Sequence, residues 1–510
     1  LGRSEEAVVS CRKAIAINPD LAMAHNNLGN ALQGLGRLDE AVVSYNKALA
    51  IKSDFAEAHN NLANVLKELG RLDEAITSYR NALSIRSDLS GAGRNLLNVM
   101  LNVPGMSPKE LFDEHLGFTK RFKRHITPID KHFPNDPTPD RRLRVGYLSS
   151  DFRNHPTGSV LLPLLSSHDR AKFEVFCYAD VPRPDAVTER FHSTVDHWRP
   201  IVGKSDSEVA GMVRADAIDV LVCLAGHFDS NRPLVCAHRA APVQVSLFDG
   251  ATSGLKEMDN WLTDGFLHPP DTKEMFTEEL YRLPVLYQWL PIEEAPPVET
   301  LPAEQAGFVT FGSFNNPAKV NEEVIGLWAE VLKSVPGSRL LLKYKTWYGQ
   351  ASLQDRVVER FRGQGIEPDR IELEASPDTF AEHLGRLGDM DIALDPFPFN
   401  GATTTFQALW MGVPVVSLAG ETFISRATGS ILHHAGLGDL AVDTPKAYVA
   451  CARDLAGDLE RLRTLRKTLR ERMATSPICN APAHTRSVET AYRDMWRKWC
   501  AQPKNIPYVK

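Results

Sequence analysis

Three consecutive threonines follow an Asn-Gly pair in the stretch DPFPFNGATTTFQALW. Asn400 and Gly401 favour a tight turn, and Thr403 and Thr404 supply hydroxyl and backbone N–H groups just before a helix predicted over residues 406–411. The start of a helix attracts anions, so a diphosphate could bind here without a metal ion. Alternatively, a threonine serves only as the helix cap. The position at the carboxyl end of a buried strand favours the anion site.

The loop GSFNNPAKVNEE also follows a predicted strand. In this loop Lys319 stands after Asn316 and just before a helix, where its ammonium group could reach a phosphate. A single loop lysine is more commonly solvated, but this one follows the first strand of the same half-domain as the threonines. We therefore expect Lys319 to act as a clamp on the same anion.

Two histidines follow predicted strands further upstream, in YLSSDFRNHPTGS and CLAGHFDSNR. Histidine titrates near neutral pH and is a natural general base, so His155 is the first candidate for this role and His227 the second. Either one alone could be structural, but both are expected at strand ends of one sheet. A third histidine, His383, is expected on a helix that faces the next loop. It either packs on the surface or contacts a nucleoside, and the residues leave both readings open.

No metal site is expected. The triplet Asp389-Met390-Asp391 imitates the D-x-D metal motif of some glycosyltransferases, but it precedes a predicted strand instead of following one. The seven cysteines are scattered and form no C-x-x-C pair, which excludes a zinc site of that type and a disulfide framework. This cysteine usage predicts a cytoplasmic protein.

The first hundred residues repeat with a period of 34: the segment that begins LGRSEEAVVS at Leu1 returns as LGRLDEAVVS and LGRLDEAITS. This period predicts tetratricopeptide repeats, pairs of helices that stack because one pair cannot bury its own apolar face. Asn27, Asn61 and Asn95 occupy equivalent positions in the second helices. They are either exposed polar residues that satisfy local turns, or an amide ladder that binds the backbone of an extended peptide.

Beyond the repeats, short apolar segments such as LRVGYL and IDVLVCL alternate with segments of helix length, and the alternation restarts after a proline-rich stretch near residue 300. This pattern predicts two Rossmann-like halves, each built on a parallel sheet. The predicted divisions are repeats over 1–103, a linker helix and loop over 104–142, a first lobe over 143–298, a second lobe over 299–480, and a C-terminal helix and tail over 481–510.

Composition limits the function further. The chain has 510 residues, a hydrophobic content of 43% and a formal net charge of -6, so whole-chain charge gives no argument for binding nucleic acid or an anionic membrane. There is no apolar run long enough to span a bilayer and no signal peptide in this sequence. We therefore expect no nucleic-acid or membrane partner.

The motifs SSDFRNHPTG, DGATSG, FNNPAKV, FNGATTT and GETFISRATGS, after a set of tetratricopeptide repeats, resemble those of the protein O-linked N-acetylglucosaminyltransferases. The resemblance covers nearly the whole chain. It implies a helical repeat solenoid followed by a GT-B catalytic region of two Rossmann-like lobes. It also implies an inverting, metal-independent transfer of N-acetylglucosamine from UDP-N-acetylglucosamine to Ser or Thr of protein or peptide acceptors, with no cofactor besides the donor.

The resemblance also implies roles for particular residues. It places Asn316 and Lys319 on the diphosphate, Thr403 and Thr404 on phosphate at the helix start, His383 by the uracil, His155 near the reacting centre, and Asn27, Asn61 and Asn95 along a peptide groove.

Three positions near the expected nucleotide depart from the animal enzymes, which usually carry glutamine, histidine and aspartate where this chain has Asn316, Ala402 and Gln407. The long domain inserted between the lobes of those enzymes is replaced here by a short link, so the chain looks like the compact bacterial form. Similar plant relatives use GDP-fucose, which leaves a protein O-fucosyltransferase open. A repeat scaffold that senses a nucleotide without catalysis is the third reading.

Overall fold

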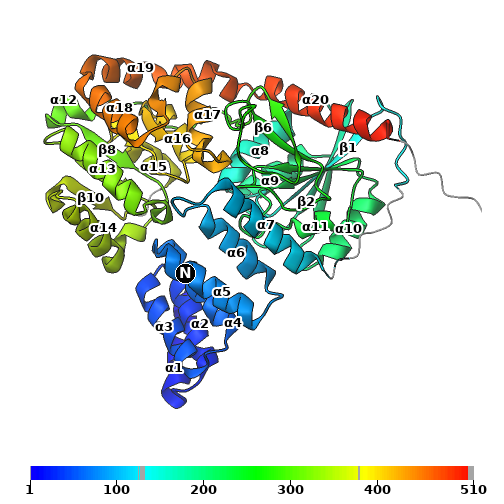
Figure 1. The fold of residues 1–510 in the computed structure, drawn as a ribbon, viewed down its shortest axis with the longest axis horizontal. Coiled ribbons are helices and arrows are strands. Elements are labelled where there is room, and N and C mark those ends of the chain that lie inside the picture. Colours follow the sequence, from blue (N-terminus) through cyan, green and yellow to red (C-terminus); the bar gives the residue numbers. More distant parts are fainter. Residues whose placement is uncertain (1, 125, 127–132, 377–378, 503–510) are drawn as a thin grey trace, which may run out of the picture. The chain divides into compact units, whose positions relative to one another are not determined.

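The computed structural model describes residues 2–124, 126, 133–376 and 379–502 (Figure 1). The chain divides into two compact units. One contains Leu1–Ser107 and Ile292–Ala474, and the other contains Pro108–Pro291 and Thr475–Lys510. Residues 125 and 127–132 of the predicted linker, and residues 503–510 of the predicted C-terminal helix and tail, lie outside the described residues. No helix in the described ranges is both long and apolar enough to cross a membrane.

The repeats form antiparallel helix pairs, blue in Figure 1. A Cβ atom added to Gly29 on α2 would lie 2.5 Å from the ring of Tyr45 on α3, so this small residue lets these two helices approach closely. Tyr45 and its equivalent Tyr79 are fully buried. The helices are α1 (Gly2–Ile17), α2 (Ala22–Gly34), α3 (Leu38–Ile51), α4 (Ala56–Glu68), α5 (Leu72–Ile85) and α6 (Ser90–Met100).

The second lobe is built on a six-stranded parallel sheet in the order β10-β9-β8-β11-β12-β13. This is the doubly wound order, which reverses between β8 and β11. The strands are β8 (Thr310–Ser313), β9 (Arg339–Lys343), β10 (Ile371–Glu374), β11 (Ile392–Leu394), β12 (Val415–Leu418) and β13 (Ala441–Val442). The α-helices are α12 (Pro302–Ala306), α13 (Glu322–Ser334), α14 (Ala351–Gly363), α15 (Phe380–Leu387), α16 (Thr403–Trp410), α17 (Ala427–His434), α18 (Pro445–Gly457) and α19 (Leu459–Thr475).

Short 3-10 helices lie in the loops between these elements. They are η1 (Pro317–Lys319), η2 (Trp347–Gly349), η3 (Pro368–Arg370), η4 (Phe423–Ser425), η5 (Gly438–Leu440) and, after α19, η6 (Pro477–Cys479).

The first lobe has a seven-stranded parallel sheet in the order β3-β2-β1-β4-β5-β6-β7, which reverses between β1 and β4. Its strands are β1 (Leu143–Ser149), β2 (Phe173–Ala179), β3 (His197–Pro200), β4 (Val220–Leu224), β5 (Val243–Leu247), β6 (Asn260–Asp264) and β7 (Glu279–Leu283). Its helices are α7 (Pro108–Lys123), α8 (Pro156–Ser167), α9 (Ala186–Thr194), α10 (Asp206–Ala215) and α11 (Leu234–Ala237). The predicted fold class, helical repeats followed by two Rossmann-like lobes, is confirmed.

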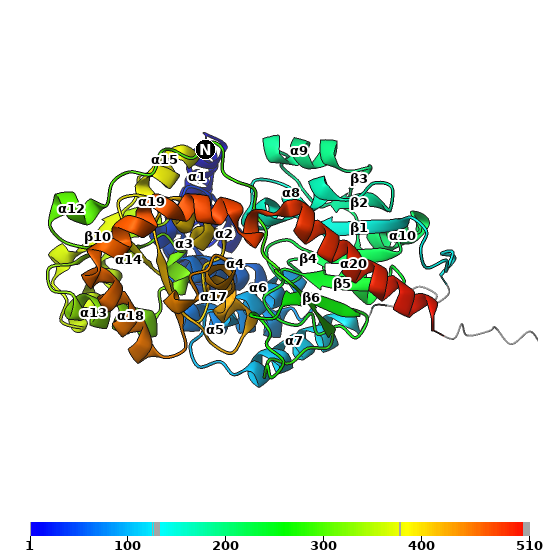
Figure 2. The same ribbon diagram turned by 90° about the horizontal axis from the view of Figure 1, so that it is seen from above.

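The C-terminal helix α20 (Ala481–Cys500) packs on the first lobe, and Figure 2 shows it crossing the strands of that lobe. The Tyr492 hydroxyl lies 3.3 Å from that of Tyr147. Glu489 accepts a hydrogen bond from the backbone N–H of Asp169, 2.8 Å, and the Trp496 indole donates to the carbonyl of Thr138, 3.2 Å. Helix α20 therefore completes the first lobe, although it is far from that lobe's strands in the sequence.

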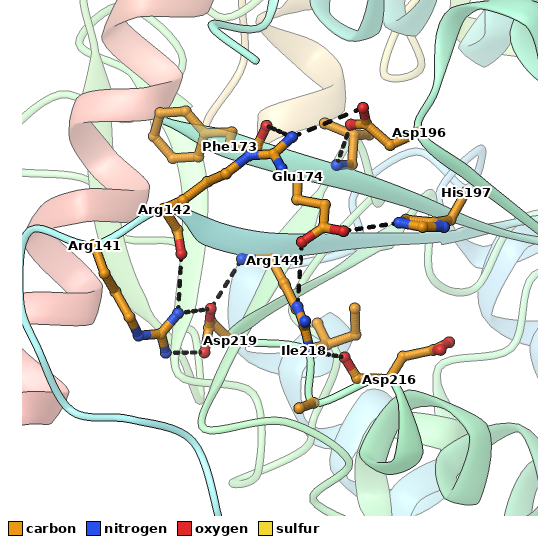
Figure 3. A network of polar contacts seen from close by, with 12 residues as sticks. Arg141, Arg142, Arg144, Phe173, Glu174, Asp196, His197, Asp216, Ile218 and Asp219 are labelled. Atoms are coloured by element: carbon orange, nitrogen blue, oxygen red, sulfur yellow. Dashed lines mark hydrogen bonds and ion pairs between the residues drawn. The ribbon is translucent and has the colours of Figure 1, made fainter. Parts of the chain in front are cut away.

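A polar network holds the amino edge of the same sheet (Figure 3). The fully buried carboxylate of Asp219, just before β4, accepts two bonds from the Arg141 guanidinium, 2.5 and 2.7 Å, and one from the backbone N–H of Arg144, 2.8 Å. Glu174 bridges Arg144 and His197, 3.2 and 2.8 Å. These bonds fix the segment that leads into β1. They lie at the amino ends of the strands, whereas ligands in such sheets bind at the carboxyl ends.

Candidate active site

The predicted phosphate residues meet at the point where the strand order of the second lobe reverses. Lys319 ends η1, which follows β8, while Thr403 and Thr404 open α16, which follows β11. Because β8 and β11 are neighbours in the sheet, their following loops lie side by side at its carboxyl edge. In doubly wound sheets the ligand binds in the crevice at this switch point.

The threonines lie inside the first turn of α16. The helix begins at Thr403, so the predicted start at Phe406 is wrong by one turn. Ala402 occupies the capping position and has no side-chain hydrogen bond, so the reading of these threonines as caps fails. The first intrahelical bond of α16 runs from Phe406 N–H to the carbonyl of Ala402, 2.9 Å. The N–H groups of the first turn are therefore available to an anion.

Gly401 and Asp395 hold this turn together. Gly401 N–H donates to Asp395 Oδ1, 2.8 Å, and the Ser417 hydroxyl donates to Oδ2, 2.7 Å. A Cβ atom on Gly401 would lie 2.6 Å from Thr404 Oγ1 and 3.0 Å from Asp395 Oδ1, so the close approach requires glycine. Burial raises the pKa of Asp395 to about 6, while these hydrogen bonds and the Lys319 charge lower it.

Lys319 reaches the turn directly. Its Nζ donates to the backbone carbonyl of Asn400, 2.8 Å, and lies 4.2 Å from the centroid of the Phe399 ring. Desolvation lowers the pKa of Lys319 to about 8, against the raising effect of Asp395. The predicted residue Asn316 caps η1 by accepting the N–H of Ala318, 2.9 Å. A weakly solvated ammonium group thus contacts the turn that leads into α16, where the first N–H groups precede the intrahelical bonds. This arrangement suits an anionic ligand.

His383 lies on α15, and its Nε2 is 3.3 Å from Gln407 Oε1 on α16. Its ring centroid is 5.8 Å from that of Phe314, which follows β8. The structure therefore brings His383 to the same edge of the sheet as the threonine turn. Contact with a nucleoside stays a prediction. The buried side chain of Asn400 donates to the carbonyl of Pro396, 3.0 Å. Asn400 therefore contacts Lys319 through its backbone carbonyl and not through its side chain.

The two histidines of the first lobe follow β1 and β4, the strands that flank its switch point. His155 caps α8: its Nδ1 accepts the N–H of Thr157, 3.2 Å, and its Nε2 lies 3.0 Å from Asp229 Oδ2. Because Nδ1 accepts, the ring proton belongs on Nε2, where it is donated to Asp229. The His155 side chain is 18% exposed.

His227 is buried and its partner was not predicted. Its Nδ1 lies 2.9 Å from Asp249 Oδ2, and its backbone N–H donates to Oδ1, 3.1 Å. Its Nε2 is buried and has no hydrogen-bond partner among the described residues, because the rings of His115 and Phe118 on α7 lie 5.1 Å away, centroid to centroid. The Asp-Gly pair after a predicted strand was the signal that could have identified Asp249.

Potential metal ligands are already engaged with protein. Asp391 accepts the N–H groups of Ala303 and Thr310, 2.9 and 2.7 Å, and Asp389 pairs with Arg386, 2.8 Å. A separate trio, Asp151, His155 and Asp229, has ligand atoms within 4.8 Å of one another. Its buried member, Asp151, accepts a bond from Asn231, 2.8 Å, and desolvation raises its pKa.

The repeat asparagines join successive repeats. Asn61 Nδ2 donates to Asn30 Oδ1, 3.0 Å, and Asn95 Nδ2 donates to Asn64 Oδ1, 3.0 Å. Asn27 is exposed. Two of these asparagines therefore join neighbouring repeats through their side chains. The sequence suggested either exposed polar residues or a peptide-binding set, and neither alternative included this role. Asn61 Nδ2 also donates to Asn26 Oδ1, 3.1 Å, so both N–H donors of this amide are used within the repeats.

Comparison with known proteins identifies the same two parts of the chain, the repeats and the two lobes. The sequence model of glycosyltransferase family 41 matches residues 120–288 and 300–488, and tetratricopeptide repeat models match residues 1–36, 34–70 and 56–89. The chain is 40% identical over 397 residues to a protein of Arabidopsis thaliana named probable UDP-N-acetylglucosamine–peptide N-acetylglucosaminyltransferase SPINDLY, covering 77% of this chain and 43% of that protein. It is 30% identical to the Arabidopsis protein SEC of the same printed activity, covering 72% and 39%.

A solved structure of a mutant O-GlcNAc transferase from Thermobaculum terrenum matches with a TM-score of 0.89 and 36% identity, covering 98% of this chain and 96% of that one. The chain spans less than half the length of the curated plant relatives that it matches. Because the family model covers well over half of the sequence, this chain belongs to glycosyltransferase family 41.

Proposed function

We propose that this protein transfers N-acetylglucosamine from UDP-N-acetylglucosamine to serine or threonine hydroxyls of proteins, with inversion and without a metal ion. The observation that carries the proposal is the placement of the Lys319 ammonium group on Asn400, at the open helix start formed by Thr403 and Thr404. The names of SPINDLY and SEC support this donor and acceptor class, and the name of the Thermobaculum enzyme supports the transferred sugar.

The chemistry has two electrostatic demands. The bond from the sugar C1 to the phosphate oxygen breaks while the acceptor oxygen bonds to C1, so negative charge grows on the leaving diphosphate. Lys319 and the N–H groups at the start of α16 would stabilise that charge, as preorganised donors do in a site of low dielectric. This arrangement supplies by protein groups the charge neutralisation that a metal ion supplies elsewhere.

The acceptor hydroxyl must also lose its proton, and we assign His155 as the acceptor of that proton. The side chain of His155 is partly exposed, whereas Nε2 of His227 is buried beneath α7. A proton taken up at Nδ1 would replace the hydrogen bond from Thr157 N–H, 3.2 Å. Two carboxylates flank the ring, with Asp229 3.0 Å from Nε2 and Asp151 3.6 Å from Nδ1.

The acceptor polypeptide would enter along the repeats. We propose that Asn27, Asn61 and Asn95 bind the backbone of an extended segment, which makes little demand on its side chains. The bonds from Asn61 and Asn95 to the preceding repeat hold the amides at fixed positions, which lowers the entropy that they lose on binding.

Donor identity is tested by calorimetry with UDP-N-acetylglucosamine, UDP-glucose and GDP-fucose, followed by mass spectrometry of a mixed peptide pool. Binding of the first donor and a mass gain of one N-acetylhexosamine on peptides support the proposal. GDP-fucose binding without a UDP response would instead make the protein an O-fucosyltransferase. Nucleotide binding without transfer or donor hydrolysis would show a catalytically silent scaffold.

A further inference from the structure

The turn between α4 and α5 lies against the segment that carries Lys319. Helix α4 packs on η1, and a Cβ atom added to Gly70 in that turn would lie 3.3 Å from the carbonyl oxygen of Pro317. The same carbonyl accepts the N–H of Val320, 3.0 Å. Gly70 therefore lies against the carbonyl group that closes the 3-10 turn ending at Lys319.

Helix α14 holds this repeat turn from the second lobe. The guanidinium group of Arg356 donates to the carbonyl of Leu69, directly before Gly70. This carbonyl is at the C-terminal end of α4, where the helix dipole favours a positive charge. Arg356, Asn321 and Gly70 line one pocket of about 530 Å³ between the repeats and the second lobe. The turn is thus held by Arg356 and contacts η1 on its other side.

The preceding repeat anchors the same helix. Ser352, at the start of α14, donates its backbone N–H to Asp39 of α3, 3.4 Å, and its hydroxyl donates to the same carboxylate. Two successive repeats therefore fix α14, and the second of them also contacts η1. The continuous path runs from Arg356 through Leu69 and Gly70 to Pro317 and then to Lys319.

We infer that Gly70 is a positioning residue for Lys319, so that the repeats orient the donor-binding ammonium group in addition to any acceptor that they carry. This inference rests on the proposed function, because it assigns a nucleotide diphosphate to Lys319. The geometric reason is that η1 contains three residues, with Pro317 at its start and Lys319 at its end. A displacement of the Pro317 carbonyl therefore also moves Lys319 relative to Asn400. A charged group must be held closely in position to stabilise a leaving group.

The chain offers a matched control for this residue. The segment LGRLDEA occurs twice, and Gly36 and Gly70 occupy the same place in it. Their φ angles are +73° and +70°, and each N–H closes the same kind of helix end. The two positions differ in what an added Cβ atom would meet. A Cβ atom at Gly36 would have no neighbour within 4 Å among the described residues, whereas a Cβ atom at Gly70 would lie 3.3 Å from the carbonyl oxygen of Pro317. Replacement by alanine strains both turns equally.

The test compares Gly70→Ala with Gly36→Ala in the whole chain. We expect similar decreases in Tm, because the backbone strain is shared, but a dissociation constant for UDP that is at least about threefold larger in Gly70→Ala alone. Hydrogen exchange of the peptide over residues 314–321 should also become faster in Gly70→Ala alone. Equal UDP affinity and equal exchange in the two variants would overturn the inference. A wild-type protein that binds no nucleotide refutes the proposed function, and the exchange measurement then decides the contact by itself.

A second variant leaves both glycines unchanged. Arg356→Met removes the bond to Leu69 and should weaken UDP binding in the same direction as Gly70→Ala. Its control is Arg453→Met on α18, because Arg453 is exposed and, among the described residues, pairs with its neighbour Asp454, 2.7 Å. An Arg356→Met protein that binds UDP as tightly as the control would contradict the path through Leu69.

Discussion

The Nζ atom of Lys319 lies 2.8 Å from the carbonyl oxygen of Asn400 and so joins the loop after β8 to the turn before α16. One neutral carbonyl is the nearest acceptor of a group whose pKa desolvation lowers to about 8. An anion that approached this turn would offer the ammonium group a better partner than the carbonyl does.

Replacing Lys319 by alanine should lower the turnover of sugar transfer by roughly 10²-fold or more, because a preorganised cation is removed from the leaving diphosphate. The measurement is the rate of peptide glycosylation at saturating donor. Lys333→Ala on α13 is the control, since that side chain is exposed and pairs with Glu330, 2.7 Å. Normal turnover in Lys319→Ala would remove this residue from the mechanism.

Binding of UDP should become weaker as the pH rises through about 8. The pKa of Lys319 is lowered to about 8 in the free protein, and a diphosphate binds the protonated form better, so binding raises this pKa and takes up a proton. Calorimetry near pH 8 in two buffers of different ionisation enthalpy measures the uptake. Lys319→Ala should abolish it, and an uptake that persisted in this variant would belong to another group.

Asp249→Asn and Asp229→Asn should separate stability from catalysis. Asp249 is buried and accepts two bonds from His227, so its replacement should lower the free energy of unfolding in urea by about 1–3 kcal/mol.

The Asp229 side chain is 49% exposed, so its replacement should change the free energy of unfolding little. Asp229→Asn should nevertheless slow transfer, because it removes the carboxylate that lies 3.0 Å from Nε2 of His155 and orients the ring. Unchanged turnover in Asp229→Asn would argue against His155 as the base.

The triple variant Asn27→Ala, Asn61→Ala and Asn95→Ala should keep donor hydrolysis and short-peptide transfer but modify protein acceptors poorly. Each neutral hydrogen bond contributes about 0.5–1.5 kcal/mol, so three together weaken a long acceptor by roughly tenfold or more. Asn46→Ala, at an exposed position on α3, is the control. Equal losses on short and long acceptors would show that the asparagines support folding and do not guide the acceptor.

Transfer should survive a chelator. The trio Asp151, His155 and Asp229 is the group of described side chains that could hold a cation, and we expect EDTA to leave the rate of transfer unchanged because Lys319 and the start of α16 neutralise the diphosphate. The assay compares rates with and without EDTA after dialysis. Activity that disappears with EDTA and returns with Mg²⁺ or Mn²⁺ would reject the metal-free mechanism.

The sequence by itself determined the features that depend on near neighbours in the chain. The period of 34 identified the repeats, because each pair of helices buries its apolar face only against the next pair. The alternation of apolar segments and helix-length segments identified both parallel sheets. The Asn-Gly-Ala-Thr-Thr-Thr turn and the lysine of the preceding loop were recognised from local backbone chemistry alone, although the start of α16 was misplaced by one turn.

Only the tertiary structure decided which of these loops meet. The order of strands places β8 beside β11 and brings Lys319 to Asn400, although 81 residues separate them. It also pairs His227 with Asp249, covers His227 with α7, and seats α20 on the first lobe. Strand order, register and helix docking are set by the summed packing of residues far apart in sequence. No local pattern therefore predicts that a histidine expected to be a base has its free nitrogen buried, or that a glycine in a repeat touches the loop of the proposed donor site.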